Sequence, residues 1–256
     1  LGKGYQNPHF VDPKPTFIIT LNKADLLLHT GLEQEIGWLP LLITASRNSK
    51  ISTEGASGNI DCSKFIKNIL EIPSGQVDRS LGDIHPGGNP HYMLNPRNGL
   101  QVAEGLYQKL SEIDPINRSF YEINYLNFSK KLSLKIIEWE KKLKPYNGSN
   151  FITYHKLWPY FFDWANFNLV DTMEPIPGVP PSPSHISKLV EKAQNTKVDL
   201  VISSNYFPEK TPKIIADKIG ADFLSLPVMV GGNDKVKDYI GFFDFLIDQI
   251  TSKLNS

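Results

Sequence analysis

The sequence predicts an α/β protein of two lobes joined by one long helix, and three observations support this prediction. Strand and helix patterns alternate regularly in residues 146–256, which is typical of a parallel sheet covered by helices. Residues 115–144 form one uninterrupted helical pattern, which is longer than most helices of globular domains. The chain has 256 residues, enough for two lobes of ordinary size.

The composition excludes several classes of function. Apolar residues make up 40% of the chain and charged residues 21%, as in a globular protein with a sizeable core. The 27 basic and 27 acidic residues cancel, and no basic run with interleaved aromatics occurs, so nucleic acid is not an expected partner. No apolar stretch approaches the ~20 residues that span a bilayer. Cys62 is the single cysteine, so the chain can form neither an internal disulfide nor a thiolate cluster.

The first half of the chain predicts short elements after a Pro-rich opening. Residues 4–15 are expected to be an extended loop that carries His9, because their prolines disfavour a helix. The elements expected next are a helix at 16–23, a buried strand at 25–31, a helix at 33–45 kinked at Pro40, and a helix at 96–113. Residues 48–81 have only a weak pattern.

The clearest element is the helix expected at residues 115–144. Asp114 is a favourable N-cap, and Pro115 suits the first helical position. Large apolar side chains then recur at intervals of four and three, at Tyr121, Tyr125, Phe128, Leu132, Ile136, Trp139 and Leu143. A helix of about thirty residues would span roughly 45 Å at 1.5 Å per residue. We therefore expect it to bridge two lobes; a coiled-coil seam is the alternative, made less favourable by the aromatic positions.

Strand and helix patterns alternate after the long helix. Strands are expected at 151–155, 169–173, 199–203 and 221–226, and helices at 158–165, 184–194, 211–219 and 238–254. Residues 174–183 form a rigid Pro-rich connector. In open α/β sheets of this kind, ligands bind in the crevice beyond the carboxyl ends of the strands.

A rigid loop at residues 85–91 reads His-Pro-Gly-Gly-Asn-Pro-His and carries two candidate metal ligands. Proline and glycine exclude a helix or the middle of a sheet here, so the loop holds an imidazole at low entropic cost. His9 and His91 both follow an Asn-Pro pair, so we expect His91 to be the ligand and His85 to support the loop. The alternative is a surface turn that happens to contain histidine.

Two further candidates end predicted strands. His155 lies at the carboxyl end of the first strand of the second half, and Glu174 ends the next strand, so both can point into one crevice. Taken singly, Glu174 could be an ordinary surface carboxylate. His29 is expected to be a hydrogen-bonded core residue and His185 a solvated one.

Three imidazoles and one carboxylate would form a closed four-ligand site for a divalent first-row metal. No candidate general base accompanies them, and the phosphate-loop, Gly-x-Ser-x-Gly and His-Glu-x-x-His signatures are absent, so we expect binding rather than catalysis. A metal-assisted hydrolase that uses His85 and His91 with an open coordination position is the competing class.

Five stretches together carry a family resemblance: residues 7–15 around His9, residues 24–33, residues 88–96 around His91, residues 153–161 around His155, and residues 174–183. Over essentially its whole length the chain resembles the zinc/manganese substrate-binding proteins of bacterial ABC importers, called cluster A-I or cluster 9. The resemblance implies two α/β lobes with parallel sheets, one long rigid helix between them, and a metal site in the inter-lobe cleft. It also implies that a first strand and helix of the first lobe are missing before the His9 loop.

The resemblance places three metal ligands on His9, His91 and His155. The family's usual fourth ligand is an aspartate late in the second lobe, but Pro227 stands there in this chain. We therefore expect Glu174 as the fourth ligand, with Asp234 and then water as alternatives.

The predicted function is that of an extracytoplasmic receptor, not an enzyme, which captures a divalent metal ion and delivers it to an ABC permease. Zinc suits three imidazoles and a carboxylate, manganese is the alternative, and a surface adhesin on the same scaffold is a further one. We expect a monomer located in the periplasm or on the cell surface, with a lipid anchor outside this chain as an open alternative. The expected units are an N-terminal lobe at 1–114, a linking helix at 115–145 and a C-terminal lobe at 146–256.

Overall fold

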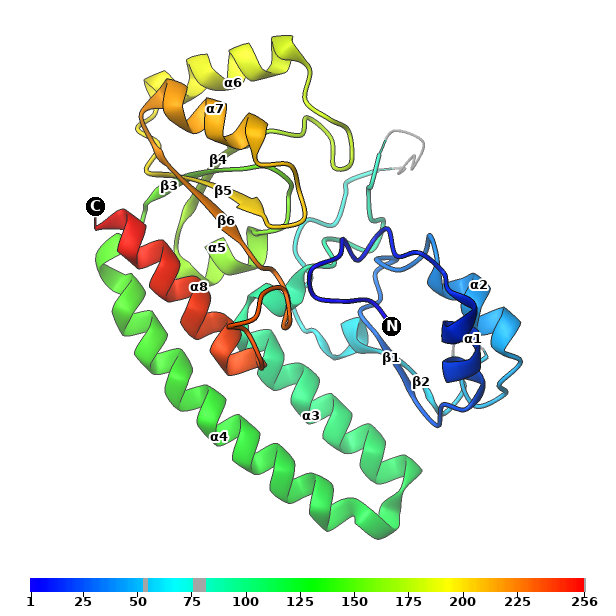
Figure 1. Cartoon of the computed structure of the whole chain (residues 1–256). Helices are drawn as coiled ribbons and strands as arrows, with labels where there is room; N and C mark the ends of the chain where they lie inside the picture. The colour runs from blue at the N-terminus through cyan, green and yellow to red at the C-terminus, as the bar shows by residue number, and fades with distance from the viewer. Residues whose placement is uncertain (53–54, 76–81, 256) are drawn as a thin grey trace.

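The computed structural model describes residues 1–52, 55–75 and 82–255. It has two lobes, each with a parallel sheet, beside a layer of long helices (Figure 1). The small sheet lies in the first half of the chain, and a four-stranded sheet lies in the second half. The predicted two-lobe α/β fold is therefore confirmed. No helix in the described part of the chain is both long and apolar enough to cross a membrane.

The N-terminal lobe is built from short elements around a small core. Its elements are α1 (Pro15–Asn22), β1 (Leu27–His29), α2 (Leu39–Ser46), β2 (Asn59–Asp61), and the 3-10 helices η1 (Cys62–Phe65) and η3 (Tyr92–Leu94). Strands β1 and β2 pair in parallel, with Leu27 opposite Asn59. The core between α1, β1 and α2 includes Leu21, Trp38 and Leu42. Strand β2 lies in the weakly patterned 48–81 region, of which residues 53–54 and 76–81 lie outside the described part.

Two expectations for this lobe are wrong in detail. The helix expected at 33–45 begins only at Leu39, so Pro40 lies in its first turn and does not kink it. Proline suits that turn because it lacks only a donor that a helix start leaves unused. Leu32 and Glu33 have left-handed φ angles of 50° and 60°, which excludes a helix start at Glu33. The strand expected to be buried at 25–31 covers three residues, and Leu28 in its middle is exposed.

Three long helices lie against one another beside the two sheets. Helix α3 (Pro96–Ile113) matches its expected bounds, with the Asn95 side chain accepting a hydrogen bond from the Arg97 N–H at its start. A 3-10 turn at Pro115–Asn117 then leads into α4 (Arg118–Leu143). Helix α4 packs against α3 from the first half of the chain and α8 from the second half (Figure 1). This placement fits a helix that links the two lobes.

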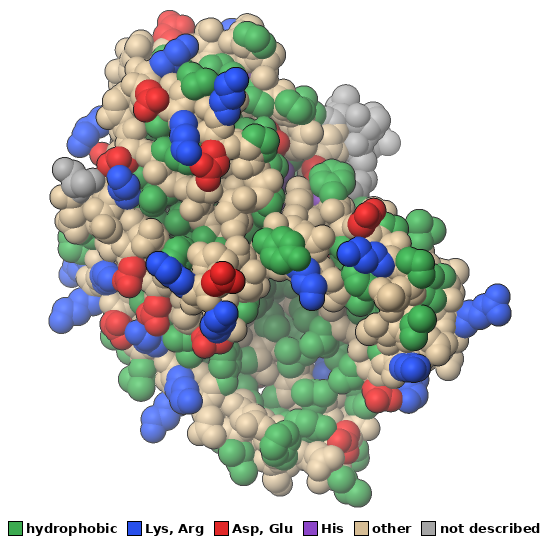
Figure 2. Space-filling model, in the orientation of Figure 1, with side chains coloured by type: hydrophobic (Ala, Val, Ile, Leu, Met, Phe, Trp, Pro, Cys, Tyr) green, Lys and Arg blue, Asp and Glu red, His purple; other side chains and the backbone are tan. Residues whose placement is uncertain are grey.

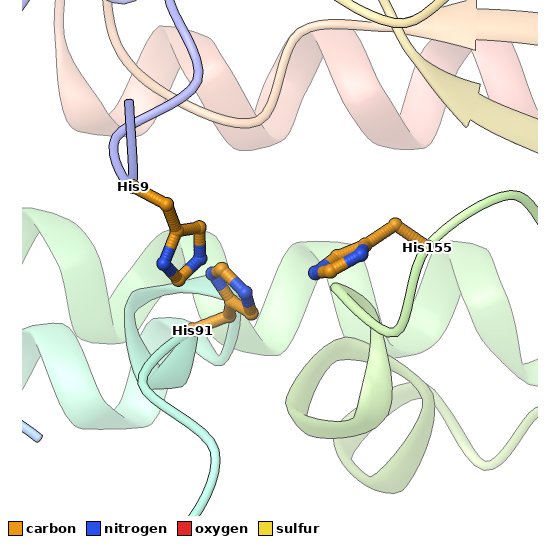
Figure 3. Close-up of side chains that lie close together, drawn as sticks. All are labelled: His9, His91 and His155. Atoms are coloured by element: carbon orange, nitrogen blue, oxygen red, sulfur yellow. The ribbon is translucent and has the colours of Figure 1, made fainter. Parts of the chain in front are cut away.

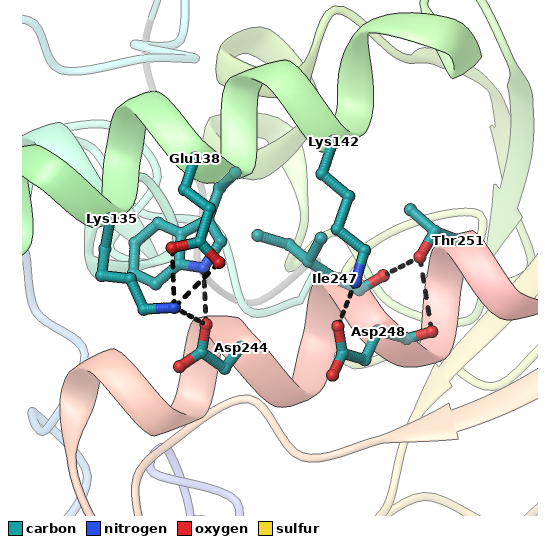
Figure 4. A network of polar contacts seen from close by, with 8 residues as sticks. Lys135, Glu138, Lys142, Asp244, Ile247, Asp248 and Thr251 are labelled. Atoms are coloured by element: carbon teal, nitrogen blue, oxygen red, sulfur yellow. Dashed lines mark hydrogen bonds and ion pairs between the residues drawn. The ribbon is translucent and has the colours of Figure 1, made fainter.

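The contact between α4 and α8 combines an apolar core with ion pairs. Leu132, Ile136, Trp139 and Leu143 of α4 are buried in the main core of the C-terminal lobe. At the rim, Lys135 Nζ lies 2.9 Å from Asp244 Oδ1, which also accepts a 2.8 Å hydrogen bond from Trp139 Nε1 (Figure 4). Lys142 pairs with Asp248 one turn further along α8. These contacts fix the long helix to the C-terminal lobe.

The C-terminal lobe is a doubly wound sheet. Its elements are β3 (Asn150–Thr153), α5 (Pro159–Ala165), β4 (Asn168–Thr172), α6 (Pro183–Asn195), β5 (Leu200–Ser204), α7 (Lys210–Ile219), β6 (Asp222–Leu226) and α8 (Tyr239–Leu254). The strands run in parallel in the order β4-β3-β5-β6. One apolar core lies between the sheet and α5, α8 and α4, and a second lies between the sheet and α6 and α7. The carboxyl ends of β3 and β4 therefore open on the same edge of the sheet, where His155 and Glu174 follow.

Candidate metal centre

His9 is held in the N-terminal loop by contacts of its neighbours. Pro8 precedes His9 and Pro13 follows it, and residues 11–14 have no regular structure. Helix α1 begins only at Pro15. The Asn7 side chain accepts a 3.0 Å hydrogen bond from the His9 N–H, and the Trp38 indole donates to the Pro8 carbonyl. His9 is thereby buried although it lies on a loop.

His91 lies in a turn that contacts both lobes. The Asn89 side-chain oxygen accepts a 2.9 Å hydrogen bond from the His91 N–H, and its amide group donates to the carbonyl of Lys156. Tyr160 of α5 donates its hydroxyl to the Asn89 carbonyl at 2.9 Å. The loop of the N-terminal lobe is thus joined to the segment that carries His155.

His155 follows the carboxyl end of β3, as expected. The Thr153 hydroxyl donates to the His155 carbonyl at 3.0 Å, which turns the chain away from the sheet. The imidazole is buried, like those of His9 and His91. Only small parts of histidine side chains reach the surface between the lobes (Figure 2).

The three imidazoles lie together although they come from three distant segments (Figure 3). One nitrogen from each ring lies within 4.8 Å of the other two. The ring centroids are 5.5 Å apart for His9 and His91, 5.9 Å for His91 and His155, and 6.2 Å for His9 and His155. A group of three neutral imidazoles is a donor set suited to zinc and its first-row neighbours.

Each of these rings also has a polar group beside its Nδ1 atom. Glu174 Oε2 lies 2.5 Å from Nδ1 of His155, Asp83 Oδ2 lies 3.5 Å from Nδ1 of His9, and Gln34 Nε2 lies 3.2 Å from Nδ1 of His91. A carboxylate that accepts the Nδ1 proton leaves the lone pair of a neutral imidazole on Nε2. Glu174 is placed to act in this way on His155, as the partners of metal-binding histidines do.

The electrostatics favour neutral ligands. Burial, together with the nearby imidazoles of His9, His155 and His85, lowers the pKa of His91 well below its usual value of 6.5. His91 therefore stays neutral and able to donate a lone pair at moderately acidic pH. Burial also raises the pKa of the Cys62 thiol to about 12, so this group does not supply a thiolate ligand at neutral pH.

The remaining candidates lie in different surroundings. The Glu174 carboxylate is buried against His155 and also accepts a 3.0 Å hydrogen bond from the Gly178 N–H, while Asp234 is exposed in a turn. His29 contacts the Asn59 side chain at 2.9 Å, in keeping with a hydrogen-bonded residue, although it is only half-buried. His185, expected to be solvated, is half-buried with Nε2 3.2 Å from the Thr172 carbonyl oxygen.

Two polar groups at the candidate centre were not predicted from the sequence. Gln34 belongs to a left-handed turn that was expected to be a helix, so no pattern indicated its contact with His91, 57 residues away. Asp83 carried a weak signal, because it lies two residues before His85 in the same loop. A cavity of about 470 Å³ is lined by Asp83, His85, His91 and His155, among other residues.

The buried imidazole cluster lies between the two α/β lobes. The family model described as "Zinc-uptake complex component A periplasmic" matches residues 1–253, and the chain belongs to this family. The predicted membership of the zinc/manganese substrate-binding proteins is therefore confirmed.

Individual relatives are similar at modest identity. The chain is 26% identical over 217 residues to the metal ABC transporter substrate-binding lipoprotein ScbA of Streptococcus cristatus, and the match covers 82% of this chain and 66% of that protein. It is 26% identical over 226 residues to the manganese ABC transporter substrate-binding lipoprotein PsaA of Streptococcus pneumoniae, with the same coverage of both chains. The chain thus spans just under two thirds of the length of these relatives.

Solved structures of the same fold cover the chain almost completely. A crystal structure of ZnuA superposes with a TM-score of 0.77 at 25% identity, covering 98% of this chain and 88% of that one. The substrate-binding protein FpvC of Pseudomonas aeruginosa, solved in complex with Mn²⁺, superposes with a TM-score of 0.80 at 19% identity, covering 100% of this chain and 88% of that one. This last likeness concerns the fold alone.

Proposed function

We propose that this protein captures a divalent first-row metal ion between its lobes and delivers it to a membrane permease of the ABC type. The observation that carries the proposal is the convergence of His9, His91 and His155 from three distant segments. Two of these segments precede α4 and one follows it. An ion bound by all three would therefore join the two halves of the chain.

A location outside the cytoplasm fits this proposed role. The family description names a periplasmic protein, and the relatives are called lipoproteins of ABC transporters. We further propose the unit limits 1–114, 115–145 and 146–256, because α4 contacts α3 on one side and α8 on the other.

Zinc is our first choice for the ion. Three neutral nitrogen donors suit its tetrahedral preference, and one further oxygen would complete the coordination. Manganese is the second candidate, because it prefers oxygen ligands and because some relatives are named for it. The proposed ligands are His9, His91, His155 and Glu174.

Glu174 can serve the site in two ways. Its Oε2 contacts Nδ1 of His155, which supports a role in orienting that ring and raising its basicity. Among the described residues it does not belong to the group of mutually close ligand atoms. We therefore propose that it acts through His155, and direct ligation is the alternative that Glu174→Gln distinguishes.

The identity of the ion is tested by elemental analysis of the purified protein, followed by competition between zinc and manganese. We expect one equivalent of a divalent metal and a preference for zinc. A preference for manganese would support the second candidate. Absence of binding to either ion would overturn the proposed function.

A further inference from the structure

A second set of ligand groups adjoins the proposed site. His9, Asp83 and His85 each offer one ligand atom within 4.8 Å of the other two. The rings of His9 and His85 have centroids only 5.0 Å apart. We call this set the outer site, and we call the set of His9, His91 and His155 the inner site.

His85 is oriented as metal-binding histidines are. Its Nδ1 lies 2.8 Å from the Leu32 carbonyl oxygen, which can only accept, so Nδ1 carries the proton and donates. The lone pair of the neutral ring is then on Nε2. The left-handed φ angle of 50° at Leu32 belongs to the turn that presents this carbonyl.

Asp83 lies at a ligand's distance from His9. Its Oδ2 is 3.5 Å from Nδ1 of His9, longer than an ordinary hydrogen bond. Two ligands about 2.1 Å from one tetrahedral ion lie ~3.4 Å apart, which is nearly this separation.

The position of Asp83 is fixed by the C-terminal lobe. Its N–H donates to the Pro177 carbonyl at 2.7 Å. At Gly82, whose φ is 149°, an added Cβ would lie 2.7 Å from that same carbonyl oxygen, so the chain passes too close for any other residue. The outer site is therefore complete only where the two lobes touch.

The two sites share one cavity and one ligand. Asp83, His85, His91 and His155 line the same space of about 470 Å³. The Asp83 side chain is 15% exposed, against 4% for His9 and 7% for His155, so the outer site lies nearer to solvent. A neutral imidazole offers one lone pair at a time, so a neutral His9 can serve only one ion.

We propose that the outer site is an entry position, in which His9, Asp83 and His85 hold the incoming divalent cation before it moves to the inner site. The proposal rests on the proposed function, because the inner site is its destination. The negative charge of the Asp83 carboxylate attracts a hydrated cation, and the carboxylate replaces one of the water ligands of that cation. The imidazoles of the inner site then retain the ion.

The outer site is tested by removing the inner one. In the His91→Ala/His155→Ala double variant, with retained folding checked by circular dichroism, titration with Co²⁺ followed by visible absorption should show one weakly bound equivalent. Adding Asp83→Asn should weaken this residual binding by about tenfold or more. A folded double variant that binds no Co²⁺, or one that Asp83→Asn leaves unchanged, would overturn the outer site.

A kinetic measurement covers the case in which the double variant does not fold. In the otherwise unmodified chain, stopped-flow binding of Zn²⁺ should be slowed several-fold by Asp83→Asn and by His85→Ala, with the stoichiometry kept at one. The matched controls are Asp217→Asn and His185→Ala, which change an exposed carboxylate on α7 and a histidine outside the cavity. Equal rates in all four variants would contradict the entry role. Failure of the unmodified chain to bind Zn²⁺ would instead overturn the proposed function, so the two outcomes are distinguishable.

Discussion

At the proposed centre, each of the three imidazoles has a polar side-chain group beside its Nδ1 atom. The contact between His155 and Glu174 is the tightest of these, at 2.5 Å, and both groups are buried. A buried carboxylate without a partner would be costly, so the pair stabilises both side chains. The ring of His155 is thereby oriented before any ion arrives.

Glu174→Gln separates the two possible roles of this carboxylate. The glutamine carbonyl can still accept the Nδ1 proton of His155, so an orienting role predicts a loss of zinc affinity of about tenfold. His155→Ala should cost far more in the same titration. Equal losses in the two variants would identify Glu174 as a direct ligand, as the sequence predicted.

The lowered pKa of His91 predicts a loss of stability in acid. Above its ordinary pKa of about 6.5, His91 is neutral in the folded and unfolded states, so it adds no pH dependence. Below that pH His91 takes up a proton in the unfolded chain but stays neutral in the folded chain. The free energy of unfolding therefore falls as the pH is lowered.

Urea unfolding of the chelator-treated protein at pH 7.5 and 5.5 measures this effect. The unmodified chain should lose more stability over this interval than His91→Gln, which cannot titrate at that position. Equal losses would show that the pKa of His91 is not depressed.

Among the elements, those with a strong local pattern were predicted and those set by distant contacts were not. Helix α3 and the strands of the C-terminal sheet follow directly from apolar spacing and caps. The start of α2 at Leu39 was missed because the turn through Leu32 and Glu33 uses left-handed backbone angles that have no sequence signature in non-glycine residues. Strand β2 was missed because three residues paired with β1 form no recognisable alternation.

The same distinction applies to the site. His9, His91 and His155 could be selected from their loops and strand ends, whereas Gln34 and Asp83 act through contacts between distant segments. Asp83 depends on the Pro177 carbonyl in the other lobe, which no local pattern indicates.

The packing of helix α4 against the C-terminal lobe can be tested with two leucine variants. Leu132 is fully buried in the main core, whereas Leu134 on the same helix is exposed. Leu132→Ala should lower the free energy of unfolding by about 2–5 kcal/mol, because it leaves a cavity. Leu134→Ala is the matched control. Chemical denaturation of both variants should show little change in the free energy of unfolding for Leu134→Ala. Similar losses would mean that α4 does not pack against the C-terminal lobe through this face.

In the whole molecule, the proposed metal centre lies where the two lobes meet. The N-terminal lobe supplies His9 and His91, and the C-terminal lobe supplies His155 with Glu174. The Asn89 side chain and the Asp83 N–H also cross between the lobes to backbone carbonyls. An ion held by both lobes would strengthen this contact.

Calorimetric titration of zinc into the unmodified chain and into His155→Ala tests whether one bound ion joins the two lobes. We predict one ion per chain for the unmodified protein and a loss of affinity by orders of magnitude for the variant, because the C-terminal lobe then supplies no imidazole. Unchanged zinc affinity in a folded His155→Ala variant would contradict a site that joins the two lobes.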